Sequence, residues 1–204
     1  GNSYTITATD GDLKGWRRLH EMAGAGLEDN AAYQRIQGRN PDGTANAEYE
    51  NLLDVEGLVD YMLVILYGGN LDAPISRFAG NRIGNNWHGI RSRNGAHGFR
   101  FFIWDAEHTL LDVLEDRMGP FTAGEDFERS NPQWLWQQCL ANAEFRRLVA
   151  DRAHSLLSPG GILSPQKTRA AFLERMKQIE QAVVGESARW GDLGNRRRGF
   201  LGIF

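Results

Sequence analysis

Cysteine is almost absent from this sequence. Cys139 is the only one among 204 residues, so no intrachain disulfide can form and a metal–thiolate site is not expected. Cys139 follows Trp134, Leu135 and Trp136 in an apolar stretch, which predicts that it is a small buried hydrophobic side chain. The lack of disulfides is compatible with the cytoplasm and does not exclude secretion.

Long apolar runs and charge of one sign are also absent. No run reaches the roughly 18 apolar residues of a membrane-spanning helix, so the sequence predicts no membrane span. No basic-apolar leader is visible either, and the chain begins at Gly1. The 23 Lys and Arg nearly balance the 26 Asp and Glu, giving a formal net charge of −3. This balance gives no reason to expect nucleic acid or an anionic membrane as a partner.

Several well-known catalytic motifs are missing as well. The sequence contains no Gly-x-Ser-x-Gly elbow, no His-Glu-x-x-His zinc pair and no Walker phosphate-binding loop. It also contains no internal repeat and no low-complexity tract. The arginine run at residues 196–198 is interpreted as part of a solvated tail, with polyanion binding as the alternative.

Apolar periodicity predicts a mostly helical α+β domain with one β-hairpin. The strongest helix is expected at residues 51–67, with Asp54 as a candidate cap and Gly68-Gly69 as its end. One strand is expected to begin at the Asn85-Asn86-Trp87 segment and a second to span residues 99–104. They are joined by a turn at Asn94-Gly95, whose central residues both tolerate positive φ. We expect three parts: residues 1–50 with short helices and a strand, a main domain at residues 51–195, and a tail at residues 196–204. A last long helix begins after Ser164-Pro165, and its inward face is predicted to carry Ala171, Leu173, Met176, Ile179 and Val183.

Oxygen-bearing side chains gather on turns and strand ends within residues 67–112. Asp72 lies in the turn after the long helix, Asn86 precedes the first strand, and Asp105 and Glu107 follow the second. Carboxylate and amide oxygens suit hard cations such as Mg²⁺, with Ca²⁺ as an alternative. We therefore predict that the turn and the hairpin exit converge on one cation.

Each of these residues also has a structural interpretation. Asp72 could cap a turn, Asn86 could bond the loop backbone, and Glu107 could form an ion pair. Asp105 could cap a strand end or pair with Arg82 or Arg91. The choice of amide ligand stays open among three asparagines, of which Asn86 is preferred because it directly precedes Trp87; the other two are Asn81 and Asn85.

The motifs of this stretch, in their order, resemble the CotH family, the spore-coat-H type of atypical protein kinases. They are a Gly-Asn-x-Asp turn ending at Asp72, an Asn-Asn-Trp segment ending at Trp87, and a Phe-Phe-x-Trp-Asp-Ala-Glu-His-Thr-Leu run from Phe101 to Leu110. The match continues through Glu144-Phe145-Arg146 and the Gly161-Ile162-Leu163 turn to the segment that ends at Asp192. It covers about residues 53–192 and is weak before them.

The resemblance implies phosphoryl transfer from ATP to Ser or Thr of a coat or surface protein. Asp72 then takes the catalytic role, while Asn86, Asp105 and Glu107 are the candidate ligands of Mg²⁺ against the nucleotide phosphates. It also implies a cell-surface, extracellular or spore-coat location. In the family a nucleotide-binding lobe precedes the matched region, and the only lysines here are Lys14, Lys167 and Lys177. We therefore expect residues 1–204 to resemble the C-terminal lobe, with weak or absent ATP binding by itself.

Two other functions fit the same residues. The first is a noncatalytic cell-surface module for adhesion or assembly, which would keep the tryptophans and the core without needing Mg²⁺. The second is a structural domain that a cation such as Ca²⁺ stabilises through Asp105 and Glu107. Thermal melts with metal and with nucleotide separate these alternatives, because a ligand that binds the native state raises the melting temperature.

Overall fold

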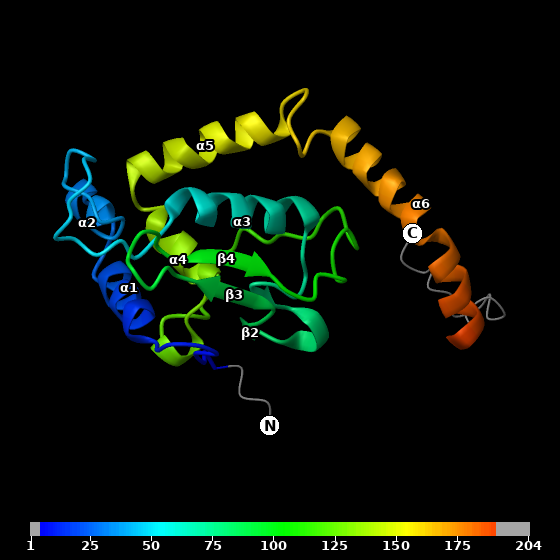
Figure 1. The fold of residues 1–204 in the computed structure, drawn as a ribbon, viewed down its shortest axis with the longest axis horizontal. Helices are drawn as coiled ribbons and strands as arrows, with labels where there is room; N and C mark the ends of the chain where they lie inside the picture. Colours follow the sequence, from blue (N-terminus) through cyan, green and yellow to red (C-terminus); the bar gives the residue numbers. More distant parts are fainter. Residues whose placement is uncertain (1–4, 191–204) are drawn as a thin grey trace. The chain divides into compact units, whose positions relative to one another are not determined.

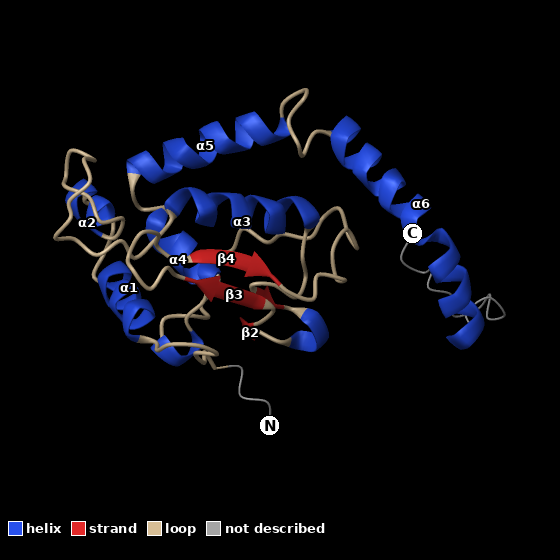
Figure 2. Cartoon of the chain, viewed as in Figure 1, coloured by secondary structure: helices blue, strands red, loops and turns tan. Residues whose placement is uncertain are grey.

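The computed structural model describes residues 5–190, which form an α+β fold of six α-helices and four short strands (Figures 1 and 2). The helices are α1 (Lys14–Gly24), α2 (Asn30–Arg35), α3 (Val55–Gly68), α4 (Pro132–Cys139), α5 (Ala143–Leu157) and α6 (Pro165–Trp190). Strand β1 (Ile75–Ser76) pairs with β2 (Ile83–Gly84), and β3 (Trp87–Ile90) pairs with β4 (Arg100–Ile103), both antiparallel. The predicted mostly helical α+β class is confirmed at this level.

The chain divides into two compact units, residues 1–152 and residues 153–204. The first unit contains every predicted site residue. Within it, α3 packs against β4 and α4, and α1 packs against α4 (Figure 1). The core between these elements is built from apolar side chains of all four, chiefly Trp16, Leu19, Leu58, Met62, Ile65, Phe101, Leu135 and Trp136.

The central helix α3 begins and ends as its sequence predicts. The Asp54 carboxylate accepts a hydrogen bond of 2.9 Å from the Gly57 backbone N–H and caps the first turn. Gly69 ends the helix in the left-handed region, with φ 56°. Asp60, the mid-helix carboxylate, forms a 2.5 Å ion pair with Arg152. The helix can therefore be apolar on most of its surface and still present one charged, paired residue.

The hairpin of β3 and β4 is confirmed, but its turn differs from the prediction. The strands pair with Trp87 opposite Ile103 and His88 opposite Phe102. Gly95 adopts φ 74°, whereas Asn94 does not adopt positive φ, so the expectation of two left-handed residues is wrong. The connection spans residues 91–99 and therefore does not need the tight two-residue turn.

The second unit corrects another prediction. Helix α6 has no buried residue among those described, so the inward face predicted for Ala171, Leu173, Met176, Ile179 and Val183 is wrong. Apolar periodicity places these side chains on one stripe, but it does not say whether another element covers that stripe. In unit 1, residues 5–9 form no strand. The predicted boundaries at residues 50 and 195 stay predictions, and the tail at residues 196–204 lies outside the described residues.

Within residues 5–190, no helix is both long enough and apolar enough to cross a membrane.

Candidate functional site

The candidate site begins at the turn that follows α3. The Asn70 side-chain carbonyl accepts a 2.9 Å hydrogen bond from the Asp72 backbone N–H, which fixes the turn locally. The Leu71 N–H donates to the His108 carbonyl at 2.8 Å, which ties the turn to the segment after β4. Asp72 is consequently buried, with 7% of its surface exposed.

The Asp72 carboxylate is held by three neutral donors. Ser76 Oγ donates to Oδ1. The Asn85 and Asn86 side-chain amides donate to Oδ2 at 3.1 and 2.9 Å. A carboxylate offers about four lone-pair positions, so roughly one remains for a further donor. The surrounding chain thus orients Asp72 and leaves it one acceptor position.

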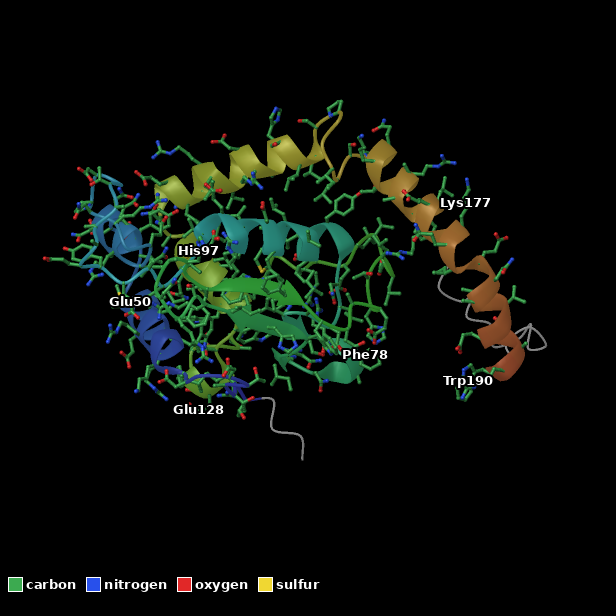
Figure 3. The ribbon with its side chains drawn as sticks, viewed as in Figure 1. Glu50, Phe78, His97, Glu128, Lys177 and Trp190 are labelled. Atoms are coloured by element: carbon green, nitrogen blue, oxygen red, sulfur yellow. The ribbon has the colours of Figure 1, made fainter. Side chains whose placement is uncertain are left out.

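A small hairpin brings the two asparagines back to Asp72. Strands β1 and β2 pair Ile75 with Gly84, and the Asn85 N–H donates to the Pro74 carbonyl at 2.9 Å. A 3-10 turn at Phe78–Gly80 connects the strands, and the Phe78 ring (labelled in Figure 3) stacks on His108 with ring centroids 4.2 Å apart. Residues distant in sequence therefore become neighbours, which explains how so long an interval between Asp72 and Asn86 can serve one site.

Asn86 joins Asp72 to the exit of the β3–β4 hairpin. Its side-chain nitrogen also approaches the Asp105 backbone carbonyl at 3.4 Å. The Asn86 backbone carbonyl accepts a hydrogen bond from the Trp104 N–H at 3.1 Å. Asn86 and Asp105 both lie in the left-handed region, with φ 51° and 52°. Asn and Asp tolerate this region better than most residues, and such conformations cluster at functional sites. The backbone thus turns sharply at both ends of this contact.

The atoms left free at this contact are oxygens. Because the Asn86 amide nitrogen faces Asp72 and Asp105, its Oδ1 is left without a hydrogen bond to the described residues. The Asp105 side chain is exposed and forms no hydrogen bond or ion pair within residues 5–190. Neither of these two oxygen groups forms an ion pair with a described cation, and Asp72 has only the nearby charge of Arg117.

The structure brings together three of the four predicted residues. Asp72, Asn86 and the backbone of Asp105 are in hydrogen-bond contact, and the pairing of Asp105 with Arg82 or Arg91 does not occur. Glu107 instead lies 3.5 Å from His108 Nε2 as an exposed pair, the structural alternative that its sequence position left open. Asn85 also reaches Asp72, whereas Asn81 has no such contact.

The oxygen atoms of this site suit Mg²⁺ that is also bound by phosphates. Among the described residues, no three His, Cys, Asp or Glu side chains are grouped to hold a metal ion. Mg²⁺, however, is commonly bound by one or two carboxylates with phosphates and water as further ligands. The Asp105 carboxylate and Asn86 Oδ1 offer oxygen ligands of this type. The residues therefore suit a magnesium–phosphate complex better than a metal caged by protein alone.

Arg117 is a neighbour of this site that sequence reasoning missed. Its side chain is 0% exposed, donates to the Ile75 carbonyl, and lies 3.3 Å from Glu115 Oε1. Burial lowers the pKa of the guanidinium, while the Glu115 hydrogen bond and the nearby charge of Asp72 raise it. The guanidinium thus holds β1 at Ile75 and contributes positive charge near Asp72. Nothing in the charged segment around Arg117 indicates such burial.

Fold and site together define a small α+β domain that carries a buried carboxylate in the turn after α3 and an exposed carboxylate at the exit of the β3–β4 hairpin. The chain belongs to the CotH family, since the family model described as CotH kinase protein matches residues 13–199. This confirms the resemblance seen in the motifs. It also extends it toward the N-terminus, because the match begins well before residue 53 and includes α1 and α2. No curated protein and no solved structure matches the chain.

Proposed function

We propose that this domain carries out Mg²⁺-dependent transfer of the terminal phosphoryl group of ATP to a Ser or Thr hydroxyl of a protein substrate, together with any nucleotide-binding lobe of the full-length protein. One observation carries the proposal: a single amide nitrogen, Asn86 Nδ2, contacts both Asp72 Oδ2 at 2.9 Å and the Asp105 carbonyl at 3.4 Å. Membership of the CotH kinase family supports a kinase-related role.

Each residue has a distinct task in this proposal. Phosphoryl transfer depends mostly on positioning and on charge stabilisation. Asp72, which Ser76 and Asn85 hold in one orientation, positions the acceptor hydroxyl and takes its proton at the remaining lone-pair position. Asn86 Oδ1 and the Asp105 carboxylate are the ligands that would hold Mg²⁺, and the metal when bound neutralises charge on the phosphates.

The outer face of the hairpin adds support for a nucleotide. Trp104, which directly precedes Asp105, is 62% exposed, and its ring meets His88 with centroids 5.7 Å apart. Ile90 and Phe102 are exposed on the same face. Aromatic side chains stack on nucleobases at a gain of about 1–3 kcal/mol per base. An exposed apolar surface therefore lies beside the groups proposed to bind phosphate.

The test is phosphate transfer by the full-length gene product. Labelled phosphate from ATP is followed into a generic Ser/Thr-containing acceptor protein with Mg²⁺ present. Asp72→Asn and Asp105→Asn should each lower the rate by about 100-fold or more, because each removes proton acceptance or metal binding. Asp151→Asn is the matched control, since Asp151 is exposed on α5 and makes no contact with the site. Unchanged rates in both site variants would contradict the proposal.

The exposed apolar face of the hairpin also favours a second candidate, a noncatalytic binding module. Thermal melts of the full-length protein with Mg²⁺, Ca²⁺ and ATP distinguish the two, because only ligands that bind the native state raise the melting temperature. Stabilisation that requires nucleotide supports the kinase. Stabilisation by metal alone supports a structural cation, and no stabilisation supports the binding module.

A further inference from the structure

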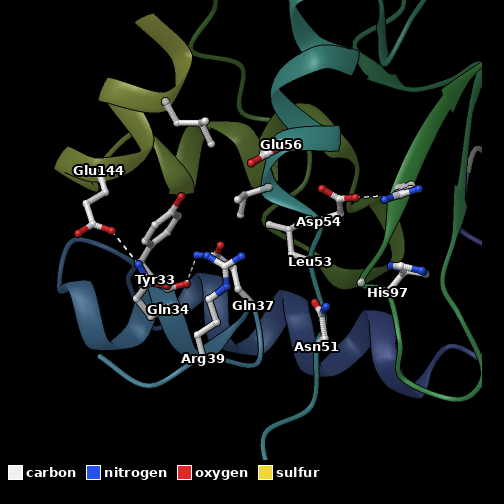
Figure 4. Close-up of a pocket in the computed structure, with 14 residues that line it drawn as sticks. Tyr33, Gln34, Gln37, Arg39, Asn51, Leu53, Asp54, Glu56, His97 and Glu144 are labelled. Atoms are coloured by element: carbon white, nitrogen blue, oxygen red, sulfur yellow. Dashed lines mark hydrogen bonds and ion pairs between the residues drawn. The ribbon is translucent and has the colours of Figure 1, made fainter. Parts of the chain in front are cut away.

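A separate polar pocket lies around the N-terminal end of α3. It encloses about 450 Å³ and is lined from α2, the chain before α3, the β3–β4 connection and the start of α5 (Figure 4). This volume falls within the range of about 300–1,000 Å³ that is typical of small-molecule sites. None of the residues of the candidate kinase site lines it.

One wall of the pocket offers an anion without a cationic partner. Glu144 accepts hydrogen bonds from the Asn30 and Gln34 side-chain amides at 3.1 and 2.7 Å, and no cation of the described chain pairs with it. Gln34 is only 6% exposed, and its Oε1 has no hydrogen-bond partner. That oxygen is enclosed by the protein, so the Glu144 carboxylate is the acceptor that lines the pocket. An ammonium group, with three donors and a positive charge, matches this carboxylate.

A cation without an anionic partner lines the same pocket. Arg39 points its side chain toward Gln37 in the middle of the pocket (Figure 4) and forms no ion pair with any carboxylate in the described part of the chain. The other arginine of the lining, Arg100, is already paired with Asp54 at 2.5 Å. Arg39 is therefore the group available to a carboxylate, which its planar fork of donors can bind through two parallel hydrogen bonds.

Apolar side chains complete the lining. Leu53 and Val55 are buried, and Leu148 is half-buried. These three aliphatic side chains cannot form hydrogen bonds with a ligand. A ligand that carries an aliphatic substituent beside its charged groups would bury apolar area against them, at roughly 25 cal/mol per Å².

We propose that this pocket binds a small zwitterion, an α-amino acid with an aliphatic side chain. Its ammonium donates to Glu144, its carboxylate accepts from Arg39, and its side chain contacts the aliphatic residues. A ligand with one charge would leave either Glu144 or Arg39 without a partner. The site is independent of the proposed phosphoryl transfer, because it shares no residue with it.

A matched series of ligands tests the proposal on the unmodified protein. L-Leucine, 3-methylbutylamine and 4-methylpentanoate share one aliphatic chain and differ in their charged groups. Titration calorimetry should show saturable binding of leucine, with the amine and the acid each about tenfold weaker or more, since each loses one charge-assisted contact. No saturable binding of leucine up to about 20 mM, far above a millimolar Kd, overturns the proposal. An amine that binds as tightly as leucine overturns it too.

Substitutions locate the binding. Arg39→Gln and Glu144→Gln should each weaken leucine binding by about tenfold or more. Arg169→Gln and Glu174→Gln make the same changes at exposed positions on α6 and should stay within about twofold of the unmodified protein. Circular dichroism checks folding. If Glu144→Gln unfolds, Arg39→Gln decides alone, because Arg39 is exposed. Leucine binding that is unchanged in Arg39→Gln contradicts the proposed site.

Discussion

Asp72 and Asp105 are the same residue type in one candidate site, yet the protein treats them in opposite ways. Asp72 is 7% exposed and accepts hydrogen bonds from three side chains. Asp105 is exposed, and its carboxylate has no partner within residues 5–190, although its backbone is fixed through Asn86. The protein therefore orients one carboxylate itself and leaves the other to be oriented by a ligand.

The difference follows from the free energy of burying charge. A buried carboxylate is tolerated only where hydrogen bonds or counter-charges replace its water. Ser76, Asn85 and Asn86 provide the hydrogen bonds at Asp72, and Arg117 provides a nearby positive charge. Asp105 keeps its water in the absence of ligand and needs only a backbone that points it outward. The two positions should consequently respond differently to the same substitution.

The largest expected change in the free energy of unfolding is at Arg117, which lies near the buried carboxylate of Asp72. Arg117→Ala should lower the free energy of unfolding by about 3 kcal/mol, because it leaves the Ile75 carbonyl without its buried donor, removes one of the two arginines at Glu115 and empties the space of a large buried side chain. Urea denaturation measures the change. Arg129→Ala is the control, since Arg129 pairs with Asp126 at the surface and should cost at most about 1 kcal/mol. Equal losses in the two variants would show that Arg117 is not a buried support.

The direct test exchanges each carboxylate for an amide. Asp72→Asn should cost about 2 kcal/mol of unfolding free energy, because the new amide nitrogen faces donors that then lack an acceptor. Asp105→Asn should change it by no more than about 0.5 kcal/mol, since the side chain is exposed and Asn also tolerates the left-handed region. Urea midpoints measured side by side give both values. A loss at Asp105 as large as that at Asp72 would remove the distinction.

Substitutions of Asn85 and Asn86 should have similar effects on stability but different effects on the Mg²⁺ requirement of phosphate transfer. Asn85→Ala and Asn86→Gly each remove one hydrogen bond to Oδ2 and should each cost about 1 kcal/mol of unfolding free energy. Glycine at position 86 accepts φ 51° without strain. In phosphate transfer by the full-length protein, only Asn86→Gly should raise the Mg²⁺ concentration for half-maximal rate, by about fivefold or more. A similar rise in Asn85→Ala would move the ligand role to Asn85.

The smallest effect is expected at Glu107. It is exposed and lies beside His108, away from the contacts that join Asp72 to Asp105. Glu107→Gln should therefore leave the free energy of unfolding within about 0.5 kcal/mol. The Mg²⁺ dependence of phosphate transfer should also stay unchanged. A clear increase in the Mg²⁺ requirement would restore Glu107 as a metal ligand, in accordance with its position in the sequence.

Local patterns were sufficient for the elements that carry the site. Asp54 and Gly69 mark the ends of α3, and Asn94-Gly95 marks the connection between β3 and β4. Each of these signals depends on a few neighbouring residues, so it can be read without knowing the fold. The resemblance to the CotH family then singled out Asp72, Asn86 and Asp105 among the many polar residues.

The arrangement within the site depends on contacts that no local pattern contains. Strands β1 and β2 are two residues each, too short to show alternation, yet they bring Asn85 and Asn86 to Asp72. Arg117 lies in a charged segment, and only its contact with Ile75, far away in the sequence, explains its burial. The uncovered apolar stripe of α6 has the same origin, since periodicity describes one helix and not its neighbours.

The convergence of Asp105, Asn86 and Asp72 on one cation can be measured directly by NMR. In a titration of isotope-labelled protein with Mn²⁺ as a paramagnetic probe for Mg²⁺, the signals of the Asn86 side-chain amide and the Asp105 backbone amide should broaden first, both in the presence and in the absence of ATP. The same titration of Asp105→Asn should lose that selectivity. Early broadening at other acidic positions, or an unchanged pattern in Asp105→Asn, would contradict a shared cation site.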